Sequence, residues 1–139
     1  MVTRRPTIQV PVGQLVIGSE HPVRVQSMTN TVSADADATL AQIRRLQDEK
    51  CELIRVTIPD EASAANIPTW MRAMDVPLIA DIHFNHKMAL AAIAAGADKV
   101  RINPGNIGKE SKVREVLQAA RDKGTAMRIG VNSGSLEKD

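Results

Sequence analysis

Three arginines occupy equivalent places in short apolar stretches of this chain. Arg55, Arg101 and Arg128 each stand between two apolar residues, within the segments 53–57 and 100–103 and the run 127–132. Residues two apart in an extended strand share a face, so each guanidinium would point away from its apolar neighbours. A guanidinium is costly to bury without a partner, and its planar fork of donors suits phosphate oxygens. The pattern therefore predicts a shared anion site.

Further polar residues fall on the same predicted face. Asp81 and His83 alternate with apolar residues in the segment 78–83, and Asn103 and Asn132 follow two of the arginines. A carboxylate beside an imidazole suits proton transfer or hydroxyl recognition. Taken singly, each arginine also fits a salt bridge to an acid of a neighbouring strand. His83 also fits a histidine at the rim that is simply paired with Asp81. Asp81 is the only acid of the set, however, so it cannot neutralise three arginines.

The elements that must position these residues alternate between strand and helix patterns. Strands are predicted at 23–28, 53–58, 78–82, 99–103 and 126–131. Helices are predicted between them, with caps at Ser33 or Asp35, at Asp60 and at Asn85, and a last helix from Lys109 to Lys123. Pro68 is expected to split the second helix, because proline cannot donate the backbone hydrogen bond. In the last helix four residues are expected to face inward: Val113, Val116, Leu117 and Ala120.

Repeated βα units give parallel strands with right-handed crossovers, as in a (β/α)₈ barrel or an open doubly wound sheet. Equivalent polar residues on four consecutive strands favour the barrel, because a barrel gathers them around one axis. A complete barrel takes eight strands and roughly 250 residues. We therefore predict an α/β fold in which residues 23–139 form the first part of a TIM barrel, about five βα units of the eight. Residues 1–22 are predicted to form a β-hairpin that caps it, and 132–137 a loop and helix cap.

Two local features need separate interpretation. The segment 103–108, Asn-Pro-Gly-Asn-Ile-Gly, leads into a helix, so its backbone amides are predicted to cradle a phosphate, although it lacks a Walker ending. Cys51 is the only cysteine, which excludes an intrachain disulfide and a cysteine-ligated cluster; it is expected to be structural.

Composition narrows the classes of partner. The net charge is only +2 and aromatic residues make up 1% of the chain, which argues against nucleic-acid binding. The sequence has no run as apolar and as long as a membrane helix, and its first residues lack a signal-peptide core. We therefore expect a cytoplasmic protein with no membrane partner.

Four segments, in this order, resemble the hydroxymethylbutenyl diphosphate synthase family, the iron–sulfur reductases of the methylerythritol phosphate route to isoprenoids. They are Val25-Gln26-Ser27-Met28-Thr29-Asn30-Thr31, Ala80-Asp81-Ile82-His83-Phe84, and the runs 101–108 and 128–136. The resemblance implies the substrate-binding barrel of an oxidoreductase that converts 2-C-methyl-D-erythritol 2,4-cyclodiphosphate to 4-hydroxy-3-methylbut-2-enyl diphosphate. It places substrate contacts on Arg55, Asp81, His83, Arg101, Asn103, Arg128 and Asn132.

The same resemblance implies parts that this chain does not carry. Family members hold a [4Fe–4S] cluster on three cysteines and a glutamate of a separate C-terminal domain. They form homodimers and take two electrons from flavodoxin or ferredoxin. Cys51 matches none of the cluster ligands, so the chain alone is expected to be inactive and no catalytic residue is assigned. Two alternatives stay open: a pterin-binding barrel transferase, and a non-catalytic half-barrel that binds phosphorylated ligands.

Overall fold

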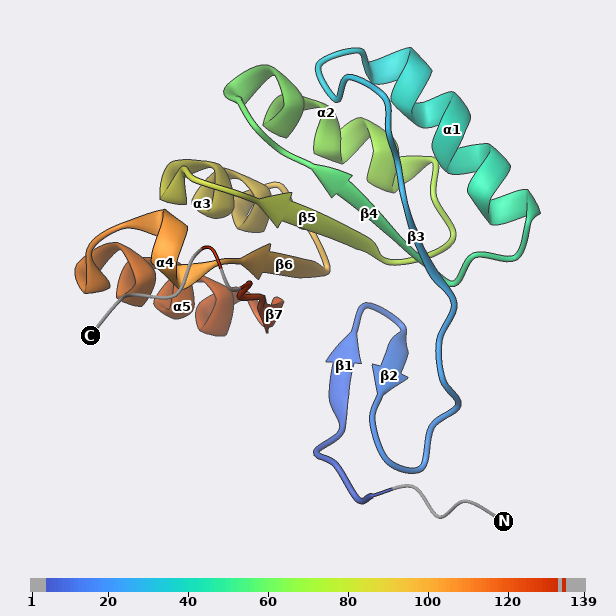
Figure 1. Ribbon diagram of the computed structural model, residues 1–139. Helices are drawn as coiled ribbons and strands as arrows, with labels where there is room; N and C mark the ends of the chain where they lie inside the picture. The colour runs from blue at the N-terminus through green and yellow to red at the C-terminus, as the bar shows by residue number, and fades with distance from the viewer. Residues whose placement is uncertain (1–4, 133, 135–139) are drawn as a thin grey trace.

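The computed structural model describes residues 5–132 and 134 (Figure 1). Five parallel strands form one sheet in the order of the chain: β3 (Gln26–Met28), β4 (Leu53–Thr57), β5 (Leu78–Ile82), β6 (Lys99–Ile102) and β7 (Ala126–Ile129). The helices between them are α1 (Ala36–Asp48), α2 (Glu61–Arg72), α3 (His86–Ala94), the short α4 (Pro104–Ile107) and α5 (Glu110–Lys123). An antiparallel hairpin, β1 (Val10–Val12) and β2 (Leu15–Ile17), precedes the sheet. Residues 133 and 135–137, part of the predicted terminal loop and cap, lie outside the described residues.

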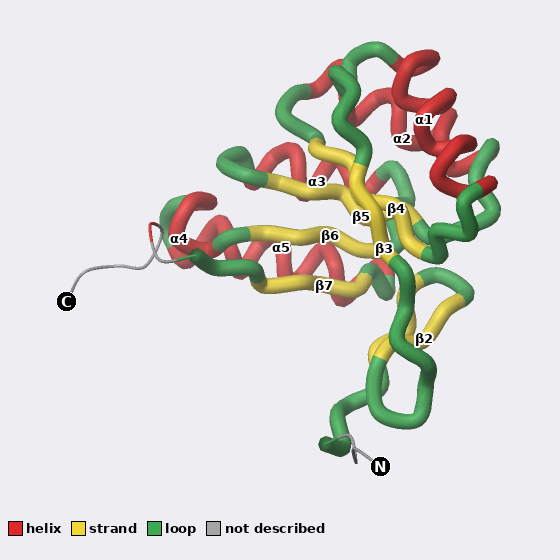
Figure 2. The backbone as a smooth tube through the Cα atoms, turned by 45° about the vertical axis from the view of Figure 1, so that its right-hand side comes forward, coloured by secondary structure: helices red, strands yellow, loops and turns green. Residues whose placement is uncertain are grey.

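The arrangement of the sheet distinguishes the two predicted architectures. Each strand is hydrogen-bonded to the strand that follows it in the chain, with no reversal of strand order. The helices lie along one face of the curved sheet, and successive helices contact one another (Figure 2). An open doubly wound sheet would carry helices on both faces. The prediction of a partial TIM barrel is therefore confirmed.

Apolar residues form two cores, one on each side of the sheet. The larger core lies between strands and helices and includes Ile54, Ile82, Val100 and Trp70. The smaller one lies on the helix-free face and contains four buried residues, Val12, Leu53, Ile79 and Ala126. Neighbouring residues of a strand thus lie on opposite faces, in an outer apolar set and an inner set, as the alternation predicts. Leu15 and Ile17 of the hairpin pack against this smaller core.

Helix caps agree with the sequence, whereas one predicted break does not occur. Asp35, Asp60 and Asn85 each accept a backbone hydrogen bond at a helix start. The predicted split at Pro68 is wrong, because α2 runs unbroken through it. A proline inside a helix removes one backbone hydrogen bond. On either side of it the buried Ile67 and Trp70 hold the helix to the core, and Trp70 Nε1 donates to Ala36 O at 3.1 Å.

Two further expectations need correction. Leu117 is 43% exposed, because α5 packs against α3 on one flank and no described element covers the flank that carries Leu117. The first strand begins at Gln26 and not at residue 23. The carbonyl of Val25 accepts from the two consecutive amides of Glu52 and Leu53, so the regular ladder starts only after it.

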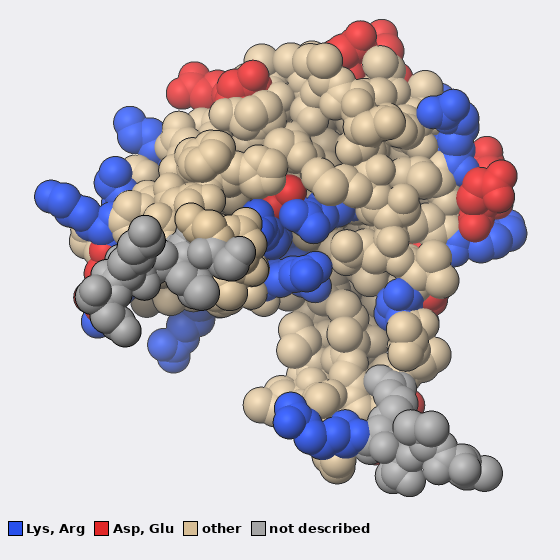
Figure 3. Space-filling model, viewed as in Figure 1, with Lys and Arg blue, Asp and Glu red and all other residues tan. Residues whose placement is uncertain are grey.

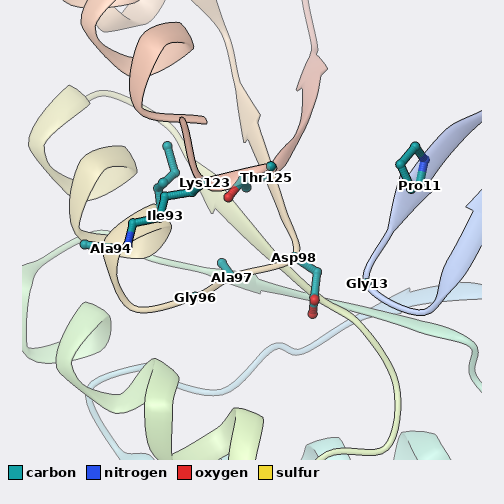
Figure 4. Close-up of a pocket in the computed structure, with 10 residues that line it drawn as sticks. Pro11, Gly13, Ile93, Ala94, Gly96, Ala97, Asp98, Lys123 and Thr125 are labelled. Carbon is teal, nitrogen blue, oxygen red and sulfur yellow. The ribbon is translucent and has the colours of Figure 1, made fainter. Parts of the chain in front are cut away.

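A cavity of about 240 Å³ lies where β6 and β7 begin, between the hairpin and the loops that follow α3 and α5 (Figure 4). Asp98 lines it beside the turn at Gly13, where an added Cβ would lie 2.8 Å from Asp98 Oδ1. Asp98 Oδ2 accepts the amide hydrogen of Leu78 at 2.9 Å. This carboxylate therefore lies against the hairpin turn and accepts a hydrogen bond from the start of β5, at the end opposite to the candidate site.

Asp98→Asn is expected to raise the melting temperature at pH 7, by no more than about 3 °C because the carboxyl is only partly buried. Burial raises the pKa of the Asp98 carboxyl above 3.8, while the hydrogen bond from Leu78 opposes the shift. The stability it contributes is fully present below pH 3.8 and is lost as pH rises through the folded-state pKa. The gain of the variant should vanish near pH 3 in thermal melts; a lower melting temperature at both pH values would contradict this account.

Candidate functional site

One buried carboxylate collects three basic side chains on the inner face of the sheet. Asp81 is fully buried, and its Oδ2 lies 2.7 Å from Arg55 Nη2 and 3.0 Å from His83 Nε2. Its other oxygen, Oδ1, lies 3.4 Å from Arg101 Nη1. Side chains from three consecutive strands and the end of β5 thus converge on one point, as the alternation predicts.

The register of the parallel ladder explains this convergence. Thr57 pairs with Asp81, Asp81 with Arg101, and Arg101 with Arg128. Paired residues in neighbouring strands point to the same face, so the pairing forms a row across β4, β5, β6 and β7. Arg55 starts two residues lower on β4 and reaches up to Asp81. The alternation of polar and apolar residues places these side chains on one face, and the register between neighbouring strands aligns them across the sheet.

The row carries more positive than negative charge. Asp81 is shared by the guanidinium groups of Arg55 and Arg101, whose side chains are 20% and 15% exposed. Arg128 is exposed, and no carboxylate of the described chain forms an ion pair with it. Figure 3 shows basic side chains gathered around an acidic one at the middle of the molecule, above the hairpin. The inference that Asp81 cannot neutralise three arginines is therefore confirmed.

The glycine-rich segment has a different structure from the one predicted. Asn103 is buried, and its side-chain oxygen caps α4 by accepting the amide of Gly105 at 3.2 Å. Its backbone oxygen accepts the amides of Asn106 and Ile107. These three amides serve the turn itself, so they do not form the predicted phosphate cradle. Asn103 is therefore buried between β6 and α4, whereas Asn132 lies exposed after β7.

The rim above Asp81 is open to solvent. The side chain of His83 is 44% exposed and meets the ring of Phe84 edge to face, with centroids 6.1 Å apart. A cavity of about 140 Å³ adjoins them, lined by the loops after β4 and β5 from Thr57 to Pro59 and from His83 to Asn85. His83 thus forms the exposed edge of the cluster that Asp81 makes with Arg55 and Arg101.

Lys99 is an inner-face residue that the sequence interpretation missed. It pairs with Ile79 and with Ala126, two members of the inner core, so its side chain starts inside the curved sheet. Burial lowers the pKa of its ammonium, and the positive charges of Arg128 and then Arg55 lower it further. The signal was available, because Lys99 stands two residues before Arg101 and shares its face.

Lys99→Met is expected to raise the melting temperature at pH 7, because it removes an ammonium that burial and two arginines disfavour. A base with a lowered folded-state pKa destabilises the fold while it is protonated. Stability therefore rises with pH between that lowered pKa and 10.5. The advantage of the variant should shrink as melts are repeated toward pH 10. A destabilised variant at pH 7 would show that the ammonium has a stabilising partner.

The described residues do not fit an iron–sulfur cluster. Cys51 is buried in the outer core, and its Sγ lies 3.0 Å from the carbonyl oxygen of Leu53, so it is structural, as expected. No group of three or more His, Cys, Asp or Glu in the described part is arranged to hold a metal ion. Within the same residues, no helix has the length and apolar character needed to cross a membrane.

Comparison with known proteins relates the chain to one enzyme family. The family described as GcpE TIM-barrel domain matches residues 7–139. A protein of Caulobacter vibrioides named "4-hydroxy-3-methylbut-2-en-1-yl diphosphate synthase (flavodoxin)" is 52% identical over 139 residues, all of this chain but 36% of the relative. A protein of the same name from Caldanaerobacter subterraneus is 48% identical over 136 residues, or 98% of this chain and 38% of the relative. The chain thus spans little more than a third of these relatives.

Solved structures with a similar fold are more distant in sequence. Dihydropteroate synthase of Xanthomonas albilineans superposes with a TM-score of 0.67 at 19% identity, covering 94% of this chain and 52% of the other. The enzyme from Burkholderia cenocepacia gives a TM-score of 0.60 at 18% identity, covering 94% and 65%. Likeness at this level of identity concerns the barrel fold alone.

Proposed function

The chain belongs to the GcpE TIM-barrel family, and we propose that its inner face binds the cyclic diphosphate substrate of a reductase in isoprenoid synthesis. The substrate is 2-C-methyl-D-erythritol 2,4-cyclodiphosphate, and the product is 4-hydroxy-3-methylbut-2-enyl diphosphate. The single observation that carries the proposal is the convergence of Arg55 and Arg101 on one buried carboxylate, with Arg128 beside them in the same row. The substrate-binding residues proposed are Arg55, Asp81, His83, Arg101, Asn103, Arg128 and Asn132.

The reaction defines what the binding face must do. Two electrons and two protons open the cyclic diphosphate at a carbon–oxygen bond and release one hydroxyl as water. The negative charge of the diphosphate is present throughout, so arginines that hold it fix the carbon skeleton in place. Asp81 holds the guanidinium groups of Arg55 and Arg101 on its two carboxylate oxygens, one on each. His83, which is exposed at the rim, is the group placed to contact a substrate hydroxyl.

An unsatisfied donor supports anion binding at this face. Arg55 Nε is buried and has no hydrogen-bond partner among the described residues, although Nη2 of the same side chain is paired with Asp81. A buried donor without a partner costs free energy, which an incoming oxygen anion would recover. A phosphate oxygen between the arginines would therefore satisfy a group that the protein leaves open.

The redox part of the reaction is proposed to lie outside this chain. The [4Fe–4S] cluster of the family does not fit the described residues, so no step of the reaction is assigned to a group on this chain. The relatives' names include flavodoxin; we propose flavodoxin or ferredoxin as electron donor to the complete enzyme, which we expect to be a homodimer.

Calorimetric titration of the 139-residue chain with the cyclodiphosphate tests the binding role. We expect one saturable site that inorganic pyrophosphate blocks by competition. A dihydropterin diphosphate serves as the matched competitor, because the solved barrels with a similar fold include dihydropteroate synthases. Binding of the pterin portion without binding of the cyclodiphosphate would overturn the proposal in favour of a transferase.

The isolated chain is expected to bind substrate without turning it over. After incubation with iron and sulfide under anaerobic conditions, it should show no cluster absorbance and no product with a chemical reductant. The physical reason is the lack of ligands, since Cys51 is buried and its thiol already contacts a backbone oxygen. Product formation by this chain would contradict the division between binding and redox parts.

A further inference from the structure

The side chain of Arg101 lies against the backbone at Gly130, the residue that follows β7 and carries no side chain. Arg101 Nη2 donates to the carbonyl oxygen of Gly130 at 3.4 Å, while Nη1 of the same guanidinium faces Asp81. The side chain is thus held between β5 and the residue after β7. Its position depends on both contacts.

The space that Arg101 occupies exists because residue 130 is glycine. A Cβ built on Gly130 would lie 2.5 Å from Arg101 Nε, 3.0 Å from Nη2 and 3.1 Å from Cζ. Real Cβ contacts do not reach the first of these distances. Because Nε is the base of the guanidinium and not its tip, relief of the clash must move the whole planar group.

Backbone conformation does not explain the glycine. The φ angle of Gly130 lies outside the left-handed region, unlike that of Gly124, which ends α5 at φ +68°. The amide of Gly130 donates to Ile102 O at 2.9 Å, so the chain still lies beside the end of β6 at this residue. Alanine would fit this backbone. What it would not fit is the side chain of Arg101.

We propose that Gly130 is a positioning residue that holds the guanidinium of Arg101 in its anion-binding orientation by leaving it room against the backbone. The steric part of this inference stands on its own, and only its effect on ligand affinity rests on the proposed function. Alanine at position 130 would push Arg101 off the strand, away from Asp81, and leave Arg55 and His83 as the partners of that carboxylate. The fold of the strand would stay the same.

Two readouts on Gly130→Ala separate these parts. The first needs no ligand: the Nε–H signal of Arg101 in a ¹⁵N spectrum, assigned by its loss in Arg101→Ala, should move toward the position of a solvated arginine. The second is calorimetric titration with inorganic pyrophosphate, whose affinity should fall about tenfold or more, toward that of Arg101→Ala. The double variant Arg101→Ala with Gly130→Ala should bind no more weakly than Arg101→Ala, because the two residues act through one group.

Each outcome bears on a different part of the inference. An unmoved Nε–H signal, or affinity losses that add in the double variant, would overturn the positioning role. A moved signal in a chain that binds no pyrophosphate would support the steric role and refute anion binding at this face. If Gly130→Ala unfolds, the melting temperature of the double variant decides: recovery to that of Arg101→Ala supports the clash, and no recovery overturns it.

Discussion

Asp81→Asn is expected to lower the free energy of unfolding by about 3–5 kcal/mol, the cost of removing one partner from a buried ion pair. The carboxylate is fully buried and shared by Arg55 and Arg101, which stay largely buried after the substitution. The asparagine keeps the size of the side chain, so the loss reports charge and not a cavity. Urea unfolding followed by circular dichroism measures it.

A short but exposed ion pair provides the matched control. Glu110 Oε1 and Arg114 Nη2 on α5 lie 2.6 Å apart, and both side chains are more than three-quarters exposed. Glu110→Gln should therefore cost less than about 1 kcal/mol. Inorganic pyrophosphate should also raise the melting temperature of Asp81→Asn more than that of the unmodified chain, because it replaces the missing negative charge. Equal, small losses in both variants would mean that Asp81 does not hold the arginines.

Arg101→Ala is expected to weaken binding of the cyclodiphosphate by about 2–5 kcal/mol, or about 30- to 5,000-fold. Its side chain is 15% exposed and lies in the row between Asp81 and Arg128, so a phosphate held there meets it in a poorly hydrated setting. Calorimetry gives the dissociation constant directly. Arg114→Ala, which removes an exposed arginine from α5, should leave the constant unchanged.

A lysine at position 101 distinguishes a planar fork from a simple charge. Lysine keeps the positive charge but offers no bidentate geometry to phosphate oxygens. We therefore expect Arg101→Lys to recover part of the affinity that Arg101→Ala loses. Affinity unchanged in Arg101→Ala would remove this residue from the site altogether.

Much of the fold and the central cluster could be predicted because both depend on local rules. Alternation with a period of two places Arg55, Asp81 and Arg101 on one face, and parallel pairing then brings them together. Capping by Asp35 and Asp60 likewise depends on residues within one helical turn. Each of these patterns is contained within a few residues of sequence, so it could be recognised without knowing the tertiary packing.

The errors come from effects that the local pattern does not contain. Pro68 stays within α2 because tertiary burial of its neighbours outweighs one missing hydrogen bond. The amides of the segment 103–108 are used by Asn103, a turn geometry that a glycine-rich composition does not specify. Gly130 was overlooked because its role lies in what Arg101 does across the strand, a contact between residues 29 apart. Leu117 shows the same limit on α5, where the helical period marks an apolar face but not which element covers it.

A crystal structure of the 139-residue chain with the cyclodiphosphate tests the central claim most directly. The account predicts phosphate oxygens within hydrogen-bond distance of the guanidinium groups of Arg55, Arg101 and Arg128, on the inner face of the sheet. Density for the ligand in the cavity beside the hairpin, or on the outer face, with Arg55 and Arg101 still bound to Asp81 and no ligand oxygen near Arg128, would contradict it.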